Sequence, residues 1–158
     1  MVRRADPRDA PVVAALLHDF NLEFETPTPG VEVLAGRLEV LLRGDRTIAL
    51  LGGEPAAGVA LLTLRPNLWY DGPVALLDEL YVRPPLRGRG IGTALLQRAC
   101  AVVRERGARL LEINVDEVDT DARRFYERHG YVVARAETIR YHGVELEAWL
   151  MRKEDPRR

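Results

Sequence analysis

The chain has 158 residues, 47% of them hydrophobic, which is enough for one sizeable core and favours a single domain over residues 1–152 with a flexible tail over residues 153–158. Its 23 Lys and Arg against 24 Asp and Glu give a formal net charge of −1, which argues against a nucleic-acid binder held by bulk charge. One cysteine cannot form an internal disulfide, and no long apolar run suggests secretion or membrane insertion, so we expect a cytoplasmic protein without a membrane partner.

The first part of the chain reads as short strands and two amphipathic helices. Asp6-Pro7 is a helix-start signal, in which an Asx cap precedes a proline at the first helical position. Apolar residues then recur at spacings of three and four, as on the buried face of a helix. We expect an edge strand over residues 2–5, helices over 6–25 and 31–43, and an antiparallel pair of strands over 47–51 and 58–64.

The fourth expected strand, residues 74–82, carries two adjacent carboxylates, Asp78 and Glu79. Strict two-residue alternation predicts that these two side chains point to opposite faces of the sheet. A carboxylate in an otherwise apolar strand is costly unless it is paired or functional. Asp78 and Glu79 are therefore candidate catalytic groups, and an ordinary strand-end carboxylate paired with an arginine is the alternative for each.

A glycine-rich turn follows this strand and leads into the next helix. Gly88, Gly90 and Gly92 let the backbone approach a ligand closely, and the helix that begins there points free N–H groups and its positive dipole end into the turn. Arg87 and Arg89 add donors suited to phosphate oxygens. The pattern predicts a phosphate-binding turn, but it lacks the lysine of a P-loop and the third glycine of a dinucleotide-binding fingerprint.

The rest of the chain completes a sheet. We expect a helix over residues 90–106, a strand over 110–115 in parallel with the fourth strand, and a hairpin of strands 131–140 and 144–152 around His142-Gly143. Cys100 lies among apolar neighbours without an adjacent base and reads as a small buried hydrophobe. His129 and His142 have no partners at metal-ligand spacing, so no metal site is predicted.

Two motifs resemble the GNAT superfamily of acyl-CoA N-acyltransferases. The first is Arg87-x-x-Gly90-x-Gly92 after an apolar strand, which is similar to the acetyl-CoA signature of that family. The second matches the family element Asn-x-x-Ala-x-x-Phe-Tyr-x-x-x-Gly-Phe at Ala122, Phe125, Tyr126 and Gly130. Asp119 stands where asparagine is usual; it can cap the helix, but while ionised it cannot donate a hydrogen bond to a cofactor.

The resemblance implies an α/β (α+β) fold. It is a mixed, mostly antiparallel seven-stranded sheet flanked by about four helices, in which the parallel fourth and fifth strands splay to admit acetyl-CoA. By resemblance, the pyrophosphate would lie on the glycine-rich turn, and the pantetheine arm would pair with the end of the fourth strand. The implied cofactor-binding residues are Leu80, Tyr81, Val82, Arg87, Gly88, Arg89, Gly90, Ile91, Gly92, Thr93 and Asp119.

The resemblance also implies an activity, the transfer of an acetyl group from acetyl-CoA to a primary amine by direct attack in a ternary complex. Glu79 or Asp78 would take the proton of the amine through water, and Tyr126, at the family's usual acid position, would protonate the leaving thiolate. A small amine or polyamine is the favoured acceptor. A protein N-terminus or lysine and an aminoglycoside are alternatives, a non-catalytic acyl-CoA sensor is the rival class, and a homodimer is expected.

Overall fold

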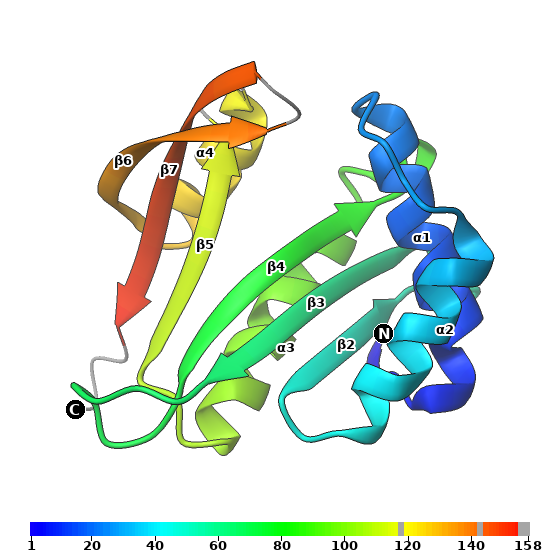
Figure 1. Ribbon diagram of the computed structural model, residues 1–158, viewed down its shortest axis with the longest axis horizontal. Helices are drawn as coiled ribbons and strands as arrows, with labels where there is room; N and C mark the ends of the chain where they lie inside the picture. The colour runs from blue at the N-terminus through cyan, green and yellow to red at the C-terminus, as the bar shows by residue number, and fades with distance from the viewer. Residues whose placement is uncertain (117–118, 142–143, 155–158) are drawn as a thin grey trace.

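The structure, a computed structural model, describes residues 1–116, 119–141 and 144–154, with side chains described for 1–115 and 119–132 (Figure 1). One sheet runs through the molecule with strand order β1-β2-β3-β4-β5-β7-β6. Neighbouring strands are antiparallel except β4 and β5, which are parallel as predicted. The elements are β1 (Val2–Arg4), η1 (Pro7–Asp9), α1 (Ala10–Glu23), α2 (Val31–Arg43), β2 (Thr47–Gly52), β3 (Gly58–Arg65), β4 (Val74–Val82), η2 (Pro84–Leu86), α3 (Ile91–Glu105), β5 (Leu110–Asp116), α4 (Thr120–Arg128), β6 (Val132–Tyr141) and β7 (Val144–Glu154).

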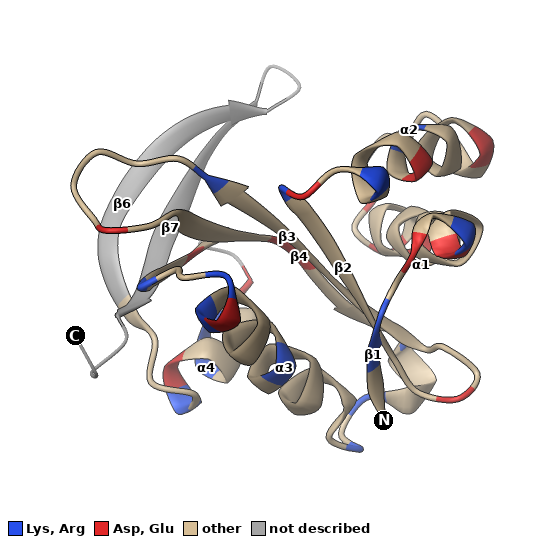
Figure 2. Cartoon of the chain, turned by 90° about the horizontal axis from the view of Figure 1, so that it is seen from below, with Lys and Arg blue, Asp and Glu red and all other residues tan. Residues whose placement is uncertain are grey.

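The helices cover the sheet in two layers, with α1 and α2 on one face and α3 and α4 on the other (Figure 2). Alternation along the strands supplies a separate core to each layer. Ile48, Leu50 and Leu62 pack with Leu95 of α3, whereas Ala49, Leu51 and Val59 pack with Val13 and Leu16 of α1.

The first helix begins as the sequence predicts but in two pieces. The Asp6 side chain accepts a hydrogen bond from the Arg8 N–H, and the Asp9 side chain accepts one from the Asp6 N–H, which together form a capping box. This box starts the short 3-10 turn η1, from which α1 continues and ends at Glu23. The predicted cap is confirmed, and the helix ends two residues before the expected Glu25.

The parallel pair is short, and its strands diverge. β4 pairs with β5 only over Ala75–Leu77 and Leu111–Ile113, although β4 continues to Val82. Beyond this point β4 leans toward α1, and β5 follows β7 instead (Figure 1). The expected splay is therefore present, and it lies next to the turn that opens α3.

One expectation about β4 is wrong. The pairing of β3 with β4 passes from Leu62–Leu77 directly to Leu61–Glu79, so Asp78 is an extra residue in a β-bulge. The bulge breaks the two-residue alternation, because Leu77 and Leu80 both pack against the core under α3. Asp78 and Glu79 consequently share the opposite face instead of pointing to opposite faces.

The C-terminal predictions are met in part. β7 extends to Glu154, so Lys153 and Glu154, which were expected in the flexible tail, belong to this strand. Residues 155–158 lie outside the described residues. The predicted His142-Gly143 turn lies outside them as well. Cys100 is partly buried, with Sγ 3.2 Å from the Tyr131 hydroxyl oxygen. None of the described helices is long and apolar enough to cross a membrane.

Candidate active site

The glycine-rich turn ends in an open helix N-terminus. Gly88 and Gly90 have φ angles of +73° and +85°, a region that residues with a side chain rarely adopt. The first helical bond of α3 runs from the Ala94 N–H to the Gly90 carbonyl, and in the described part of the chain no side chain caps this end. The N–H groups of Ile91, Gly92 and Thr93 therefore point into the turn with the positive end of the helix dipole, an arrangement that binds anions.

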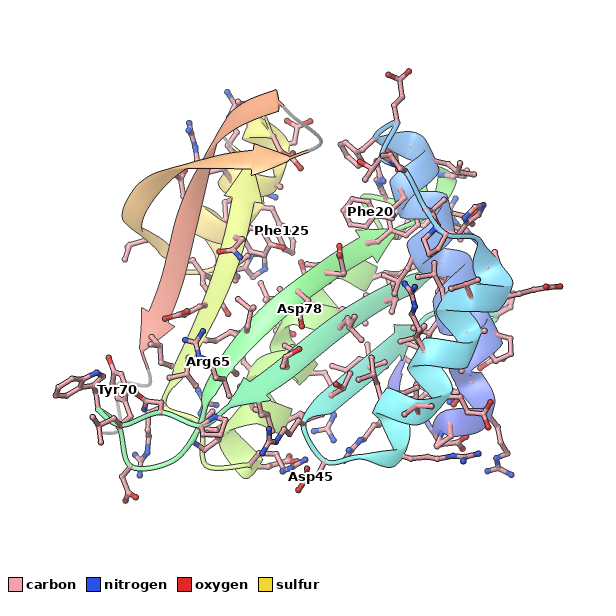
Figure 3. All side chains as sticks on the ribbon, viewed as in Figure 1. Phe20, Asp45, Arg65, Tyr70, Asp78 and Phe125 are labelled. Atoms are coloured by element: carbon pink, nitrogen blue, oxygen red, sulfur yellow. The ribbon has the colours of Figure 1, made fainter. Side chains whose placement is uncertain are left out.

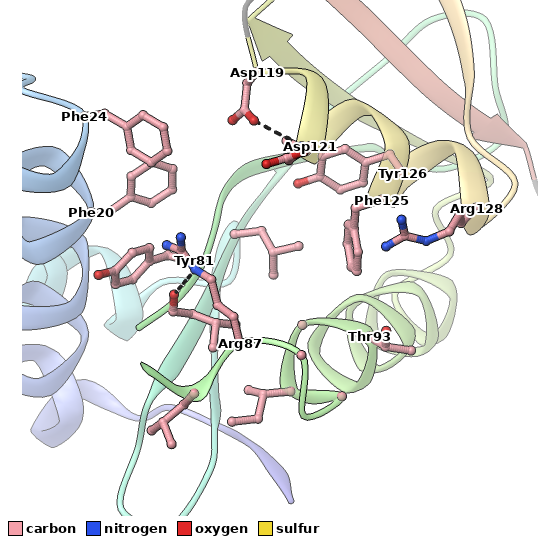
Figure 4. A pocket seen from close by; sticks show the side chains of 18 residues that line it. Phe20, Phe24, Tyr81, Arg87, Thr93, Asp119, Asp121, Phe125, Tyr126 and Arg128 are labelled. Atoms are coloured by element: carbon pink, nitrogen blue, oxygen red, sulfur yellow. Dashed lines mark hydrogen bonds between the residues drawn. The ribbon is translucent and has the colours of Figure 1, made fainter. Parts of the chain in front are cut away.

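A cavity of about 380 Å³ lies between this turn, the end of β4, α1 and α4 (Figure 4). Its volume is within the range of small-molecule sites. Of the residues predicted to bind a cofactor, Arg89 does not line the cavity. Those that do are Leu80, Tyr81, Val82, Arg87, Gly88, Gly90, Ile91, Gly92, Thr93 and Asp119. The fold thus brings residues 80–93 and Asp119, which lie far apart in the sequence, to one cavity.

Several lining residues were not predicted from the sequence. Phe20 and Phe24 of α1 reach the cavity, with the Phe20 ring stacked on Tyr81 at 5.1 Å and the Phe24 ring 5.3 Å from Phe20. Their spacing of four residues fits the buried stripe of a helix, so the sequence alone did not distinguish them from core residues. The other unpredicted lining residues are Leu86, Asp121, Ala122, Phe125 and Arg128.

Arg87 does not offer its guanidinium freely to a phosphate. Its Nε donates to the Val82 carbonyl at 2.8 Å, and its two terminal nitrogens donate to the Glu23 carboxylate at 2.8 and 2.7 Å. The guanidinium also lies over the Tyr81 ring, 5.6 Å from the centroid. Arg87 therefore anchors the turn to β4 and α1, and the backbone N–H groups of the turn are the donors that face the cavity.

Tyr126 brings a phenol to the opposite wall of the cavity. It lies on α4, whose first turn is capped by Asp119 through a 3.1 Å bond from the Ala122 N–H to Oδ1, as predicted. Tyr126 is buried, and burial raises its pKa above the usual value, with smaller contributions from the charges of Asp119 and Glu79. The hydroxyl therefore keeps its proton at neutral pH and can donate it to a developing anion.

Asp78 and Glu79 lie on the face of β4 that is turned away from α3 (Figure 3 shows Asp78). Burial, and then the charge of Asp78, raises the pKa of Glu79 to about 7. The pKa of Asp78 is raised by burial as well, against the lowering effect of a hydrogen bond from Thr63. Neither carboxylate lines the cavity itself. Glu79 lies on β4 and Tyr126 on α4, and the charge of Glu79 contributes to the raised pKa of Tyr126.

The arrangement combines two chemical functions in the cavity and a third beside it. The helix end can bind anionic groups and the Tyr126 phenol can supply a proton to a leaving group, whereas Glu79 lies outside the cavity lining and can take a proton near neutral pH. These are the groups needed for transfer of an activated acyl group from a phosphate-bearing carrier to a protonated nucleophile. Within the described residues, no group of three or more His, Cys, Asp or Glu could hold a metal ion.

Comparisons with known proteins agree with this arrangement. Residues 14–131 match the family model described as "Acetyltransferase (GNAT) family". The chain is 38% identical over 84 residues to aminoalkylphosphonate N-acetyltransferase of Salmonella typhimurium, covering 53% of this chain and 54% of that protein. It is 34% identical over 145 residues to streptothricin acetyltransferase of Streptomyces lavendulae, covering 91% of this chain and 69% of that protein.

A solved structure extends the similarity. A protein from Arthrobacter sp. FB24, assigned as an acetyltransferase, superposes with a TM-score of 0.80 at 58% identity, over 85% of this chain and 86% of that chain. The match to the aminoalkylphosphonate enzyme spans about half the length of that protein. Residues 14–131, which the family model matches, include every residue that lines the cavity. The acceptor has to be inferred from the residues of this chain.

Proposed function

Because the chain belongs to the acetyltransferase (GNAT) family, we propose that it transfers the acetyl group of acetyl-CoA to a primary amine in a ternary complex. The observation that carries this proposal is the cavity at the splay of β4 and β5, which joins the open N-terminus of α3 to Tyr126. Acetyl-CoA, the co-substrate that the family implies, carries a pyrophosphate suited to that helix end. Its thioester would then lie between Tyr126 and the carboxylates of β4.

The chain's own groups can move each proton of the reaction. An alkylamine has a pKa of about 10.4 and arrives as an ammonium ion without a free lone pair. Glu79 takes one proton, directly or through water, and the neutral nitrogen attacks the thioester carbonyl carbon. As the tetrahedral intermediate collapses, the C–S bond breaks, Tyr126 gives its proton to the sulfur, and the second proton lost by nitrogen restores the phenol.

A small amine is the acceptor that the comparisons favour. Two relatives carry names that refer to small molecules, an aminoalkylphosphonate and streptothricin, and the similarity to the second covers 91% of this chain. A covalent acetyl-cysteine route has no support, since Cys100 does not line the cavity and contacts Tyr131.

A homodimer formed through sheet edges belongs to the proposal, and light scattering at several protein concentrations tests it.

The experiment that tests the activity is acetyl-CoA-dependent thiol release against a panel of acceptors, with calorimetric acetyl-CoA binding on the same sample. The panel contains polyamines, aminoalkylphosphonates, amino acids, aminoglycosides, streptothricin-type antibiotics and N-terminal peptides. We expect binding, together with thiol release for one class of alkylamine. Binding without release by any member would favour a non-catalytic acyl-CoA sensor, and absence of binding would refute the proposal.

A further inference from the structure

The bulge in β4 gives this site two carboxylates where a regular strand would offer one. Leu61 is the partner of Glu79, and Thr63 contacts Asp78, so both acidic side chains lie on the face that Leu61 and Thr63 share. Without the extra residue, one of the two would be directed into the apolar core under α3. A charged group there would carry a large desolvation cost, so the bulge places both acids on the face that is turned away from α3.

The two carboxylates have different surroundings. The Thr63 hydroxyl donates to Asp78 Oδ2 at 2.5 Å, and Asp78 is more exposed than Glu79, although partial burial of its carboxyl still raises its pKa. Glu79 is partly buried, and among the described residues no hydrogen-bond donor contacts it. A hydrogen bond to a carboxylate favours its ionised form, whereas burial disfavours it. The geometry therefore favours a charged Asp78 beside a Glu79 that holds a proton more readily.

Among the side chains that the structure describes, no cation is paired with Asp78 or Glu79. The Arg, Asp and Glu side chains that the structure describes on the neighbouring elements β3, β5 and α1 are already joined in ion pairs. On α4, Tyr126 is the titratable group that feels the charge of Glu79. In the part of the chain with described side chains, no Lys or Arg lies within ion-pair distance of Asp78 or Glu79. The existing pairs are Arg65 with Glu112, Arg83 with Asp19, and Arg87 with Glu23.

Amine acetylation requires both binding of an ammonium ion and removal of its proton, and a single carboxylate is poorly suited to do both. The acceptor arrives as an ammonium ion, so a charged carboxylate is needed to bind it. Close contact with a cation lowers the pKa of a carboxylate and makes it a weaker base. Two carboxylates in unlike environments remove this conflict, because one can remain charged as a binding group while the other accepts the proton.

We propose that Asp78, positioned by Thr63, binds the ammonium group of the acceptor and selects acceptors that are cationic at neutral pH, while Glu79 alone removes the proton. This inference rests on the proposed acetyl transfer, and it assigns different roles to two adjacent acids. It predicts a preference for alkylamines over arylamines, which are neutral at pH 7. Asp78 is then a specificity-determining group, and Thr63 is a positioning residue.

Steady-state kinetics with the best alkylamine of the panel separates the two roles. We expect Asp78→Asn to raise KM for the amine about tenfold with kcat and acetyl-CoA affinity nearly unchanged. Glu79→Gln should instead lower kcat about 100-fold. Thr63→Val should also raise KM for the amine. Thr63→Ser, which keeps the hydroxyl, should have a KM close to that of the wild type. Glu112→Gln is the matched control, since it removes an equal charge from the neighbouring strand.

A carboxyl 13C NMR titration of protein labelled at Asp and Glu measures the pKa values of the two carboxyls without any substrate. We expect the Glu79 carboxyl to titrate near pH 7 and to titrate at lower pH in Asp78→Asn, because the neighbouring negative charge is gone. Thr63→Val should raise the pKa of Asp78. A Glu79 pKa that Asp78→Asn leaves in place, or an Asp78 carboxyl that titrates above Glu79, would overturn the inference.

The two measurements also separate this inference from the proposed function. A wild-type protein that acetylates no amine would contradict the proposed function, and the NMR titration would still test whether the two carboxyls differ in pKa as the inference requires. An active protein in which Asp78→Asn lowers kcat and leaves KM unchanged would make Asp78 the base. That result would refute the inference and leave the proposed activity intact.

Discussion

Arg87 in the turn before α3 and Glu23 at the end of α1 form a bidentate ion pair, with Nη1 2.8 Å from Oε1 and Nη2 2.7 Å from Oε2. A second pair one helical turn earlier joins Arg83 to Asp19 at 3.2 Å. The arginine of the family signature thereby attaches the glycine-rich turn to the helix that carries Phe20 and Phe24. These two ion pairs join the turn before α3 to α1, which form two walls of the cavity.

The first prediction concerns this attachment. Glu23→Gln should weaken acetyl-CoA binding about two- to fivefold, because the turn loses part of its preorganisation and exposed pairs of this kind contribute about 0.2–1 kcal/mol. Isothermal titration calorimetry with acetyl-CoA measures the effect. Glu39→Gln is the matched control, since it breaks a similarly exposed pair with Arg43 on α2. Tighter binding in Glu23→Gln would mean that Glu23 competes with the cofactor for Arg87.

The second prediction concerns Gly90. Its φ of +85° costs about 1–2 kcal/mol for any residue with a side chain, although a Cβ would meet no atom within 4 Å. Gly90→Ala should therefore lower the melting temperature modestly and weaken acetyl-CoA binding about tenfold, because its backbone forms the helix end. Gly36→Ala, at an open position in the middle of α2, should stabilise the protein by about 0.5–1 kcal/mol without changing affinity. Equal affinity in Gly90→Ala and wild type would argue against the turn as the phosphate site.

The third prediction concerns Tyr126. Tyr126→Phe should lower kcat about 100-fold with acetyl-CoA affinity retained, because the phenol acts on the thiolate that forms only during the reaction. Tyr131→Phe is the control, since Tyr131 is a buried phenol of the same aromatic cluster, with its ring 5.9 Å from that of Tyr126 and outside the cavity lining. Stopped-flow thiol release in a single turnover separates the chemical step from product release. Normal turnover in Tyr126→Phe would remove its role as the acid.

The fourth prediction concerns the stability cost of Glu79. Its pKa of about 7 in the folded protein lies above the ordinary value of 4.5. Well below pH 4.5 the carboxyl is protonated in both states, and as the pH rises from about 4.5 to about 7 the folded state loses about 3 kcal/mol relative to the unfolded state. Glu79→Gln should therefore stabilise the protein at pH 8 and have little effect at pH 4.5.

Urea unfolding at the two pH values measures this difference. The exposed Glu39→Gln variant serves as the control, because a surface carboxylate carries no comparable desolvation cost. A Glu79→Gln variant that is less stable than wild type at pH 8 would show that the charged carboxylate has a favourable partner in the folded protein. Higher stability combined with lost activity is the trade-off expected of a buried catalytic base.

Much of this protein follows from local sequence patterns. Residues 31–43 and 74–82 were predicted to the residue, because a helical stripe and a glycine stop, or an apolar run between turn residues, depend on neighbours a few positions apart. The turn at Gly88–Gly92 and the cap at Asp119 were predicted for the same reason. These features together predict the family of the chain and the position of the glycine-rich turn at the start of α3.

Other features depend on pairing between distant segments, and only the tertiary structure decided them. The bulge at Asp78 is a property of the register between β3 and β4, so alternation within β4 alone gave the wrong face for one of the two carboxylates. Arg87 is bound by Glu23, 64 residues earlier in the chain, and Phe20 acquires its place in the cavity by stacking on Tyr81. The sequence determined which chemical groups are present and approximately where the helices and strands lie. Long-range packing decided which of those groups face one another, because such contacts form only when the sheet and its two helical layers assemble.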